Sequence, residues 1–522
     1  MAKDYLPVQR DQPGLLPLDM RDWLPDDDLV WFVVEVVEAL DTSAFEVHRR
    51  TGGAGARGYD PKVLLVVLVY AYCQGVRSSR QVEARCRRDV GFRIACAGSF
   101  PDHCTLSRFR AACSQAFEDL FAQVLMVAGG AGLGRFGTVA VDGTKIAANA
   151  SVDSNRSEQW LAARAVAARV VAEAEQVDAA EDAAGEPVPD RTGLDRTDRP
   201  GRIAAALAEL EAQKAAREQA AREQDQRAQQ VLDDQRAGLA VPRRVPDACA
   251  VQVAQVRLDR AVAAQQAKVD RYAQAERDLG RRPPGRPPAP TEQCHPVRRA
   301  RQALSNAQAR ARKKEDQQHG QARTLVASTT DPASRLMPTR RGFVQGYNAQ
   351  VVATSDQLVV AVRVVQDTVD THQAEPMLAA AQAAADTLYA ATADPEHRIG
   401  TALLDAGYWS PDNAEAPPGG PDRLIATGKT HKVLKTAAAE PTTGPPPPGA
   451  TALQAMTHRL RTPEGARLYA RRGATVEPAI GNLKKIIDRF SRRGLEAAQA
   501  ELHLAAAAFN LLKIYRATQA TA

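Results

Sequence analysis

Three acidic residues stand at positions from which a folded chain could present metal-binding carboxylates. Asp142 follows a β-branched run and precedes a glycine, and Asp405 follows a second apolar run, so we expect each to end a strand. Glu477 precedes Pro478, which suits the first turn of a helix, and we therefore expect Glu477 at a helix N-terminus. Because aspartates at strand ends also serve ordinary turns, none of the three is decisive alone.

Carboxylates from three separate elements would together suit Mg²⁺, which prefers oxygen ligands and keeps several waters. Two such ions about 4 Å apart can activate a water or a DNA 3′-hydroxyl and stabilise the leaving oxygen of an in-line phosphoryl transfer. We therefore expect Asp142, Asp405 and Glu477 to bind two Mg²⁺ ions as the catalytic centre. Basic side chains around them, such as Lys145, would hold the phosphate backbone.

Basic residues are concentrated in two parts of the chain. Between Arg459 and Arg493 ten Lys or Arg residues stand against three acidic ones, and between Arg77 and Arg110 eight arginines stand against three. The second part also carries hydroxyls at a predicted helix start, which fits a helix-turn-helix-like DNA contact surface. A solvated basic helix face is the alternative in both parts. The residues expected to contact DNA here are Arg77, Arg80, Thr105, Ser107, Arg108 and Arg110.

The elements that must position these residues are mostly helical, with a modest sheet. Apolar residues at helical spacing predict helices at 29–40, 62–74, 373–382 and 495–515. A further helix should start at Ser78, with Gln81 in capping-box register. Strands are predicted at 138–142, 342–353, 358–365, 401–405 and 424–427, the second and third forming a hairpin. The expected class is α-rich α/β.

A long polar segment, 153–322, interrupts the sheet. Its sparse apolar residues recur at three- and four-residue spacing, which predicts long helices in an antiparallel coiled-coil-like hairpin with loops at 185–200 and 281–290. It is either a solvated spacer or an arm for dimerisation or DNA. We therefore expect an N-terminal all-α domain at 1–128, a catalytic domain at 129–152 and 323–522, and the insertion at 153–322.

Composition limits the alternatives. The chain has 522 residues, enough for roughly three domains. Its net charge of +6 is too small to establish a polyanionic partner without the local basic runs. Seven cysteines with no Cys-x-x-Cys pair argue against a disulfide framework and against structural zinc. With no leader and no run of 18 apolar residues, we expect a protein that stays inside the cell without a membrane partner.

Ordered motifs occur along nearly the whole chain. They are Gly58-Tyr-Asp-Pro-Lys62, Gly75-Val-Arg-Ser-Ser79, Pro101 to Arg110, Val141 to Asn149, Asp331 to Met337, Gly342 to Gln350, Asp405-Ala-Gly-Tyr408 and Val476-Glu-Pro478. In this set the chain resembles the bacterial insertion-sequence DDE transposases, whose catalytic domain is RNase H-like. The resemblance implies that Asp142, Asp405 and Glu477 are the metal-binding carboxylates and that the residues before Phe117 form a DNA-binding domain.

Related transposases also carry a tyrosine, arginine, glutamate and lysine around the third carboxylate. Tyr469, Arg472, Glu477 and Lys484 match that signature, which implies that the tyrosine, the arginine and the lysine contact DNA. Four residues separate Arg472 from Glu477, where the wider group has three, so Arg472 should approach the phosphate at a different angle.

The function predicted from these features is a transposase that cuts DNA at the terminal inverted repeats of its element. It would join the freed 3′-hydroxyls to target DNA, acting as a homo-oligomer in the cytoplasm, on the nucleoid. Two alternatives stay open. One is a DNA-binding coiled-coil protein without catalysis, by design or as a decayed copy. The other is a general Mg²⁺ nuclease, which would cut without preference for any end sequence.

Overall fold

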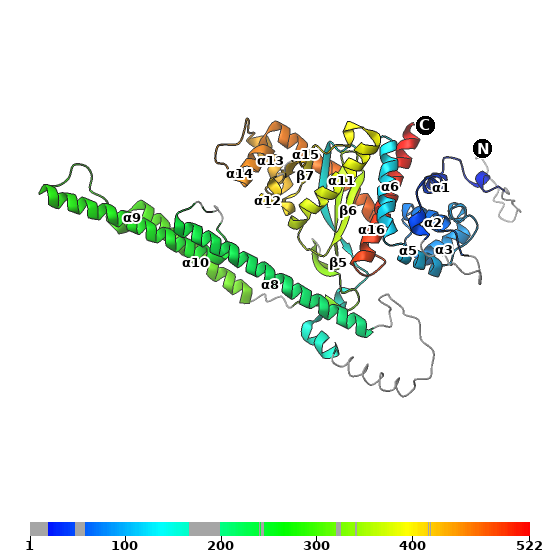
Figure 1. Ribbon diagram of the computed structural model, residues 1–522, viewed down its shortest axis with the longest axis horizontal. Coiled ribbons are helices and arrows are strands. Elements are labelled where there is room, and N and C mark those ends of the chain that lie inside the picture. Colours follow the sequence, from blue (N-terminus) through cyan, green and yellow to red (C-terminus); the bar gives the residue numbers. More distant parts are fainter. Residues whose placement is uncertain are drawn as a thin grey trace, which may run out of the picture. The chain divides into compact units, whose positions relative to one another are not determined.

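The computed structural model describes residues 19–46, 58–165, 199–239, 241, 245–319, 325–339, 342–415, 417 and 419–521. They divide into two compact units (Figure 1). One contains the described residues of 1–155 and 328–522 together with 199–202, and the other contains the helical insertion. Helices outnumber strands and the sheet is mixed, which confirms the predicted α-rich α/β class.

A six-stranded sheet forms the centre of the first unit, in the order β4-β5-β1-β7-β8 with β6 also paired to β5. The strand β5 runs antiparallel to β1, β4 and β6, whereas β1, β7 and β8 run parallel to one another. The predicted hairpin is therefore confirmed as β5 and β6. The strands are β1 (Thr138–Ala147), β4 (Arg335–Thr339), β5 (Gly342–Thr354), β6 (Val359–Val365), β7 (Thr401–Leu404) and β8 (Asp422–Ile425).

The first strand does not end at Asp142, as the sequence predicted, but continues to Ala147. The reason is its two different neighbours. The antiparallel partner β5 pairs with β1 as far as Ala147, whereas the parallel partner β7 stops at Leu404, opposite Val141. Asp142 therefore lies inside its own strand but at the end of the parallel pairing.

Helices cover the sheet and extend its core into the N-terminal region. The buried side chains of the N-terminal helices, the sheet and the C-terminal helix form one continuous hydrophobic cluster. In Figure 1, α16 lies beside α6, and residue contacts also join α16 to α2 and β6. These helices are α1 (Leu29–Ala39), α2 (Pro61–Cys73), α3 (Ser79–Arg88), α4 (Val90–Ala95), α5 (His103–Ala112), α6 (Ala116–Gly130), α11 (Ala374–Thr392), α12 (Pro411–Ala414), α13 (Thr430–Ala439), α14 (Ala452–Arg461), α15 (Pro463–Ile486) and α16 (Leu495–Thr521).

The start of α3 agrees with the sequence only in position. Ser78 is its N-cap residue, but the Ser78 side chain makes no capping hydrogen bond, so the predicted capping box with Gln81 is wrong. Ser78 is exposed, and water can satisfy the first-turn amides that the box would otherwise have bound.

The helix α15 shows a second departure from the sequence prediction. Pro478 lies inside this helix, so Glu477 is not at a helix N-terminus. A proline has no N–H for the carbonyl four residues earlier, here that of Ala474. The side chain of Gln357 replaces the missing donor, with its Nε2 donating to the Ala474 carbonyl at 3.0 Å. Gln357 lies in the turn between β5 and β6 and has a left-handed φ of 64°. A hydrogen bond from outside the helix therefore replaces the backbone hydrogen bond that Pro478 cannot make.

The second unit contains long helices, as predicted, with α9 and α10 side by side in Figure 1. A small apolar cluster joins α8 to α9 around Val231 and Val253. These helices are α8 (Arg199–Ala237), α9 (Ala250–Leu279) and α10 (His295–His319), accompanied by the short strands β2 (Asn155–Ser157) and β3 (Val326–Ser328). The predicted loop at 281–290 is confirmed, whereas most of that at 185–200 falls outside the described residues and its last two residues belong to α8. Among the described helices, none is both long and apolar enough to cross a membrane.

Candidate active site

Asp142 and Asp405 lie next to each other at the end of the parallel pairing between β1 and β7. The last paired residues are Val141 and Leu404, so the two aspartates follow at the same level of adjacent strands. Asp405 then caps a short 3-10 helix, with its Oδ1 accepting from the amide of Gly407 at 2.8 Å. The Asp142 side chain is 21% exposed. The strand pairing thus brings together two of the three predicted carboxylates.

Arg472 of α15 covers this pair. Its Nη2 lies 2.9 Å from the Asp142 carboxylate, and the arginine is 5% exposed. Its Nη1 lies 3.9 Å from Oε1 of Glu477, whose side chain is 68% exposed. Residues five positions apart on an α-helix are about 140° apart around its axis, whereas residues four apart differ by only about 40°. The extra residue between Arg472 and Glu477 therefore turns the glutamate away from the buried face that carries the arginine.

Charge at this site is only partly balanced. Burial raises the pKa of Asp142 to about 6; Arg472 opposes the shift, and the carboxylate of Asp405 adds to it. Desolvation by neighbouring protein groups also lowers the pKa of Lys484, against the attraction of Asp142, although part of the lysine side chain stays exposed. The ionised form of Asp142 is therefore destabilised here, and a cation would stabilise it.

This pKa has a measurable consequence for stability. Because the pKa of Asp142 is about 6 in the folded state and 3.8 for an ordinary aspartate, the folded protein holds a proton between these pH values that the unfolded chain releases. The free energy of unfolding should therefore fall as pH rises from 4 to 6, by about 3 kcal/mol from this residue. Urea unfolding of wild type and Asp142→Asn in metal-free buffer measures this effect. The difference between their free energies of unfolding should change by that amount between pH 4 and pH 6. A difference independent of pH contradicts the shift.

The structure adds one carboxylate that the sequence did not single out. Asp370 accepts hydrogen bonds from the side-chain amides of Asn348 and Gln350, at 2.7 and 2.8 Å. Lys145 lies 3.6 Å from the same carboxylate, and burial lowers the lysine pKa against the pull of Asp370. The hydroxyl of Tyr408 donates to the remaining amide oxygen of Gln350. Asp370 is therefore fixed in a polar network beside β1.

The glycine after Asp142 makes room for this network. A Cβ at position 143 would lie 2.5 Å from both Oδ1 of Asp370 and Nε2 of Gln350. Successive strand residues point to opposite faces, so Asp142 faces α15 while position 143 faces Asp370. The Asp-Gly pair was thus the one signal in the sequence that could have indicated a second polar group here.

We expect Gly143→Ala to displace Asp370 and to lower the free energy of unfolding by about 1–3 kcal/mol, the usual cost of overpacking. Gly137→Ala is the matched control, because a Cβ there meets no atom within 4 Å. Thermal unfolding of the two variants measures the difference. Equal melting temperatures would show that Asp370 and Gln350 can move aside without loss of stability.

Of the other residues predicted to contact DNA around this site, most lie against protein. Tyr469 is fully buried, and its hydroxyl donates to the carbonyl of Leu404 at 3.2 Å, directly before Asp405. Lys145 is occupied by Asp370, as described. Lys484, in contrast, is exposed at the C-terminal end of α15. Tyr469 thus supports the end of β7, and Lys484 keeps the exposure that a phosphate contact requires.

Two regions of the chain match known family models, and neither region contains Asp142 or Asp405. Residues 18–112 match the family model described as Transposase domain (DUF772), and residues 447–515 match the model described as Transposase DDE domain. The second match includes Arg472, Glu477 and Lys484. The two matches support an insertion-sequence DDE transposase. No curated protein and no solved structure matches it.

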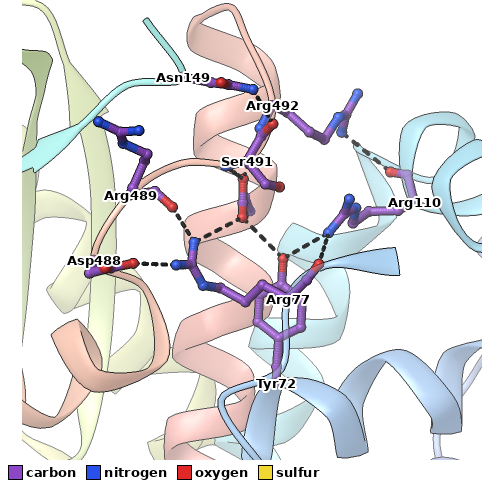
Figure 2. Close-up of polar contacts among 9 residues, drawn as sticks. Tyr72, Arg77, Arg110, Asn149, Asp488, Arg489, Ser491 and Arg492 are labelled. Atoms are coloured by element: carbon purple, nitrogen blue, oxygen red, sulfur yellow. Dashed lines mark hydrogen bonds and ion pairs between the residues drawn. The ribbon is translucent and has the colours of Figure 1, made fainter. Parts of the chain in front are cut away.

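The N-terminal match contains the other residues predicted to contact DNA, and these residues differ in exposure. Ser107, Arg108 and Arg80 are exposed. Thr105 instead helps to cap α5, its hydroxyl donating to Asp102 at 2.8 Å. Arg110 is 7% exposed. It donates to the hydroxyl of Tyr72 at 3.4 Å and to the carbonyl of Arg77 at 3.0 Å, while Arg77 itself pairs with Asp488 (Figure 2).

DDE transposases generally use divalent metal ions, and the carboxylates here fit such an ion in part. Asp142 and Asp405 supply oxygen ligands whose charge lacks full compensation. Gly407 leaves open the space beside them, since a Cβ there would lie 3.0 Å from Asp405 Oδ1 and 3.4 Å from Asp370 Oδ2. Yet within the described ranges no three His, Cys, Asp or Glu side chains are grouped as metal ligands. Glu477 is the predicted ligand that this arrangement does not bring to the pair.

Proposed function

We propose that this transposase cleaves DNA at the ends of its element and joins the freed 3′-hydroxyls to target DNA. The observation that carries the proposal is the juxtaposition of Asp142 and Asp405 at the end of the β1 and β7 pairing. Two carboxylates at this place, beside an arginine and near an exposed lysine, suit phosphoryl transfer better than they suit a purely structural role.

Asp142 and Asp405 would hold Mg²⁺, with two ions as the expected number. Glu477 would be the third protein ligand only after its exposed side chain turns from Arg472 toward the pair. The metal would supply activation of the attacking hydroxyl and stabilisation of the leaving oxygen. Arg472 keeps Asp142 oriented through the contact at 2.9 Å. Tyr469 holds the end of β7, and Lys484 is placed to meet a phosphate of the bound strand.

The strand arrangement supports an RNase H-like catalytic domain. Three antiparallel strands, β6, β5 and β1, are followed by the parallel strands β7 and β8, with the first carboxylate on the central strand. The proposed domains remain an N-terminal region at 1–128, a catalytic region at 129–152 and 323–522, and an insertion at 153–322. The insertion would serve as an arm for dimerisation or for DNA.

The test uses full-length protein with labelled duplexes that carry the element's terminal inverted repeats, in Mg²⁺ or in EDTA. We expect cleavage at the repeat and strand-transfer products, both only with Mg²⁺. Cutting without preference for the repeat would indicate a general nuclease. Binding without cleavage would indicate a non-catalytic or decayed copy. Size-exclusion chromatography with light scattering would test the proposed homo-oligomer. Fractionation of cell lysates would test whether the protein is found in the cytoplasm bound to the nucleoid, as proposed.

A further inference from the structure

A groove of about 720 Å³ opens between the N-terminal helices and the segment 487–494, which connects α15 to α16. None of the side chains that line it is acidic. Its walls come from the first turns of α3 and α5 on one side and from 489–491 on the other. The five arginines among its lining residues are Arg77, Arg80, Arg108, Arg110 and Arg489.

These arginines divide into two groups by what they contact. Arg77 pairs with Asp488 and donates to the carbonyl of Arg489, and Arg110 is bonded to protein groups as described (Figure 2). The guanidinium groups of Arg80, Arg108 and Arg489 are exposed and make no hydrogen bond or ion pair with any residue of the described ranges. Three cationic groups therefore face the groove with their donors unused.

The groove also offers unused neutral donors. The hydroxyls of Ser79 and Ser491 line it, and both oxygens are buried without a hydrogen-bond partner within the described part of the chain. The N-cap residue and the first turn of α3, Ser78 to Gln81, line the same space, and the Ser78 side chain makes no capping hydrogen bond to the first-turn amides. Guanidinium groups, hydroxyls and helix-start amides are the groups that bind phosphate oxygens.

We propose that this groove binds the sugar–phosphate backbone of double-stranded DNA through Arg80, Arg108 and Arg489. The charge of the groove selects a polyanion. Of its two aromatic lining residues, Phe490 is fully buried and His103 is paired with Glu83 at 2.7 Å, so the groove has no exposed Phe, Tyr or Trp ring on which unpaired bases could stack. A duplex backbone fits these walls better than a single strand. The inference rests on the proposed function in taking DNA as the polyanion.

The groove is joined to the catalytic strand through segment 487–494. Arg489 forms a bridge to Ala147, and the amide of Phe490 donates to the Ala147 carbonyl at 2.8 Å. The side chain of Asn149 donates to the Ser491 carbonyl at 2.7 Å. Ala147 lies five residues beyond Asp142 on β1, a distance of about 17 Å along an extended strand. For a duplex that runs along β1, the groove would therefore contact DNA about five base pairs from the reacting phosphate.

Residues from two distant regions of the chain line the groove, so it differs from a DNA contact made by the N-terminal region alone. Arg489 lies near the C-terminal end of the chain, within residues 447–515, whereas Arg80 and Arg108 lie within 18–112. If the groove is one site, Arg489→Gln should weaken DNA binding as much as Arg108→Gln.

The experiment measures binding of full-length protein to a labelled duplex end by fluorescence anisotropy over a range of salt, in EDTA and in the Asp405→Asn background so that no cleavage intervenes. Each arginine replaced by glutamine should lower the slope of log affinity against log salt by about 0.9, and by about 2.7 for the triple variant. Arg516→Gln is the matched control, an exposed arginine about 30 Å along α16 from its first residue. Because the side chains of the three groove arginines make no hydrogen bond or ion pair within the described residues, the melting temperature should not change.

Cys104 provides an independent measurement. It lines the groove and is the exposed cysteine of the seven in the chain. Saturating duplex should slow its alkylation by a maleimide at least tenfold, and hydroxyl-radical footprints should show protection about five base pairs inside the cleavage site. Unchanged labelling, or a salt slope unchanged in the triple variant, overturns the groove proposal even if wild type cleaves. Loss of binding in the variants with no cleavage by wild type would instead overturn the proposed reaction and leave the groove proposal standing.

Discussion

Replacing Asp405 with asparagine should lower end cleavage and strand transfer by about a thousandfold, corresponding to about 4 kcal/mol of lost transition-state stabilisation. The fold should survive, because an asparagine Oδ1 can still accept the hydrogen bond from the Gly407 amide. What is lost is one of the two negative charges at the end of the β1 and β7 pairing. Cleavage of a labelled terminal duplex in Mg²⁺, followed by single-turnover kinetics, measures the effect.

The control for this prediction is Asp412→Asn, which removes an exposed aspartate from the first turn of α12 without touching the site. It should retain wild-type rates. A rate for Asp405→Asn within tenfold of wild type, in protein with an unchanged melting temperature, would remove Asp405 from the proposed centre.

A second large effect is expected at Glu501 in α16, whose side chain is fully buried. Its carboxylate accepts from the amide of Ser491 at 2.8 Å and from the hydroxyl of Tyr72 at 3.3 Å, and it lies 3.8 Å from the Arg77 guanidinium. Glu501→Ala leaves the Ser491 amide and the Tyr72 hydroxyl without this acceptor and removes the charge near Arg77, which keeps its contact with Asp488. Each buried donor left unmatched costs about 1–3 kcal/mol, so we expect a total loss of about 3–5 kcal/mol. Urea unfolding monitored by circular dichroism should show this loss.

Glu496→Ala is the matched substitution, an exposed glutamate in the first turn of the same helix. It should change the free energy of unfolding by no more than about 0.5 kcal/mol. Equal losses in the two variants would mean that the buried carboxylate does not fasten the N-terminal helices to α16. Glu501→Gln should fall between them, because an amide keeps acceptor capacity but loses the charge opposite Arg77.

The sequence predicted the parts of the site that depend on local pattern. Apolar runs before Asp142 and Asp405 identified their strands, because a strand buried on both faces carries little but apolar residues. The position of Glu477 was predicted wrongly, since a proline usually opens a helix and only a distant side chain, Gln357, allows Pro478 inside one. The dependence of a helix on a turn more than a hundred residues away has no local signature.

Asp370 could not be predicted for a different reason. It lies in a polar connection with no periodicity, and its partners Asn348 and Gln350 belong to a strand whose pairing is set only in three dimensions. The structure also assigned Arg110 and Tyr469 to the interior, although their residue types fit nucleic-acid contacts. Burial of a polar side chain depends on which other groups meet it, and that information is spread over the whole chain.

We expect the hydrogen bond from Gln357 to the Ala474 carbonyl to make the stability of α15 depend on the β5 and β6 hairpin. The proline in α15 leaves a carbonyl that remains unmatched within the helix until the β5 and β6 hairpin has closed and presented its turn. A fragment covering 447–515 would contain Tyr469, Arg472, Glu477 and Lys484. It would lack Gln357, whose side chain donates to the carbonyl that Pro478 leaves without a partner. Complementation with a second fragment bearing the hairpin should therefore increase its helicity, whereas the same hairpin with Gln357→Ala should not.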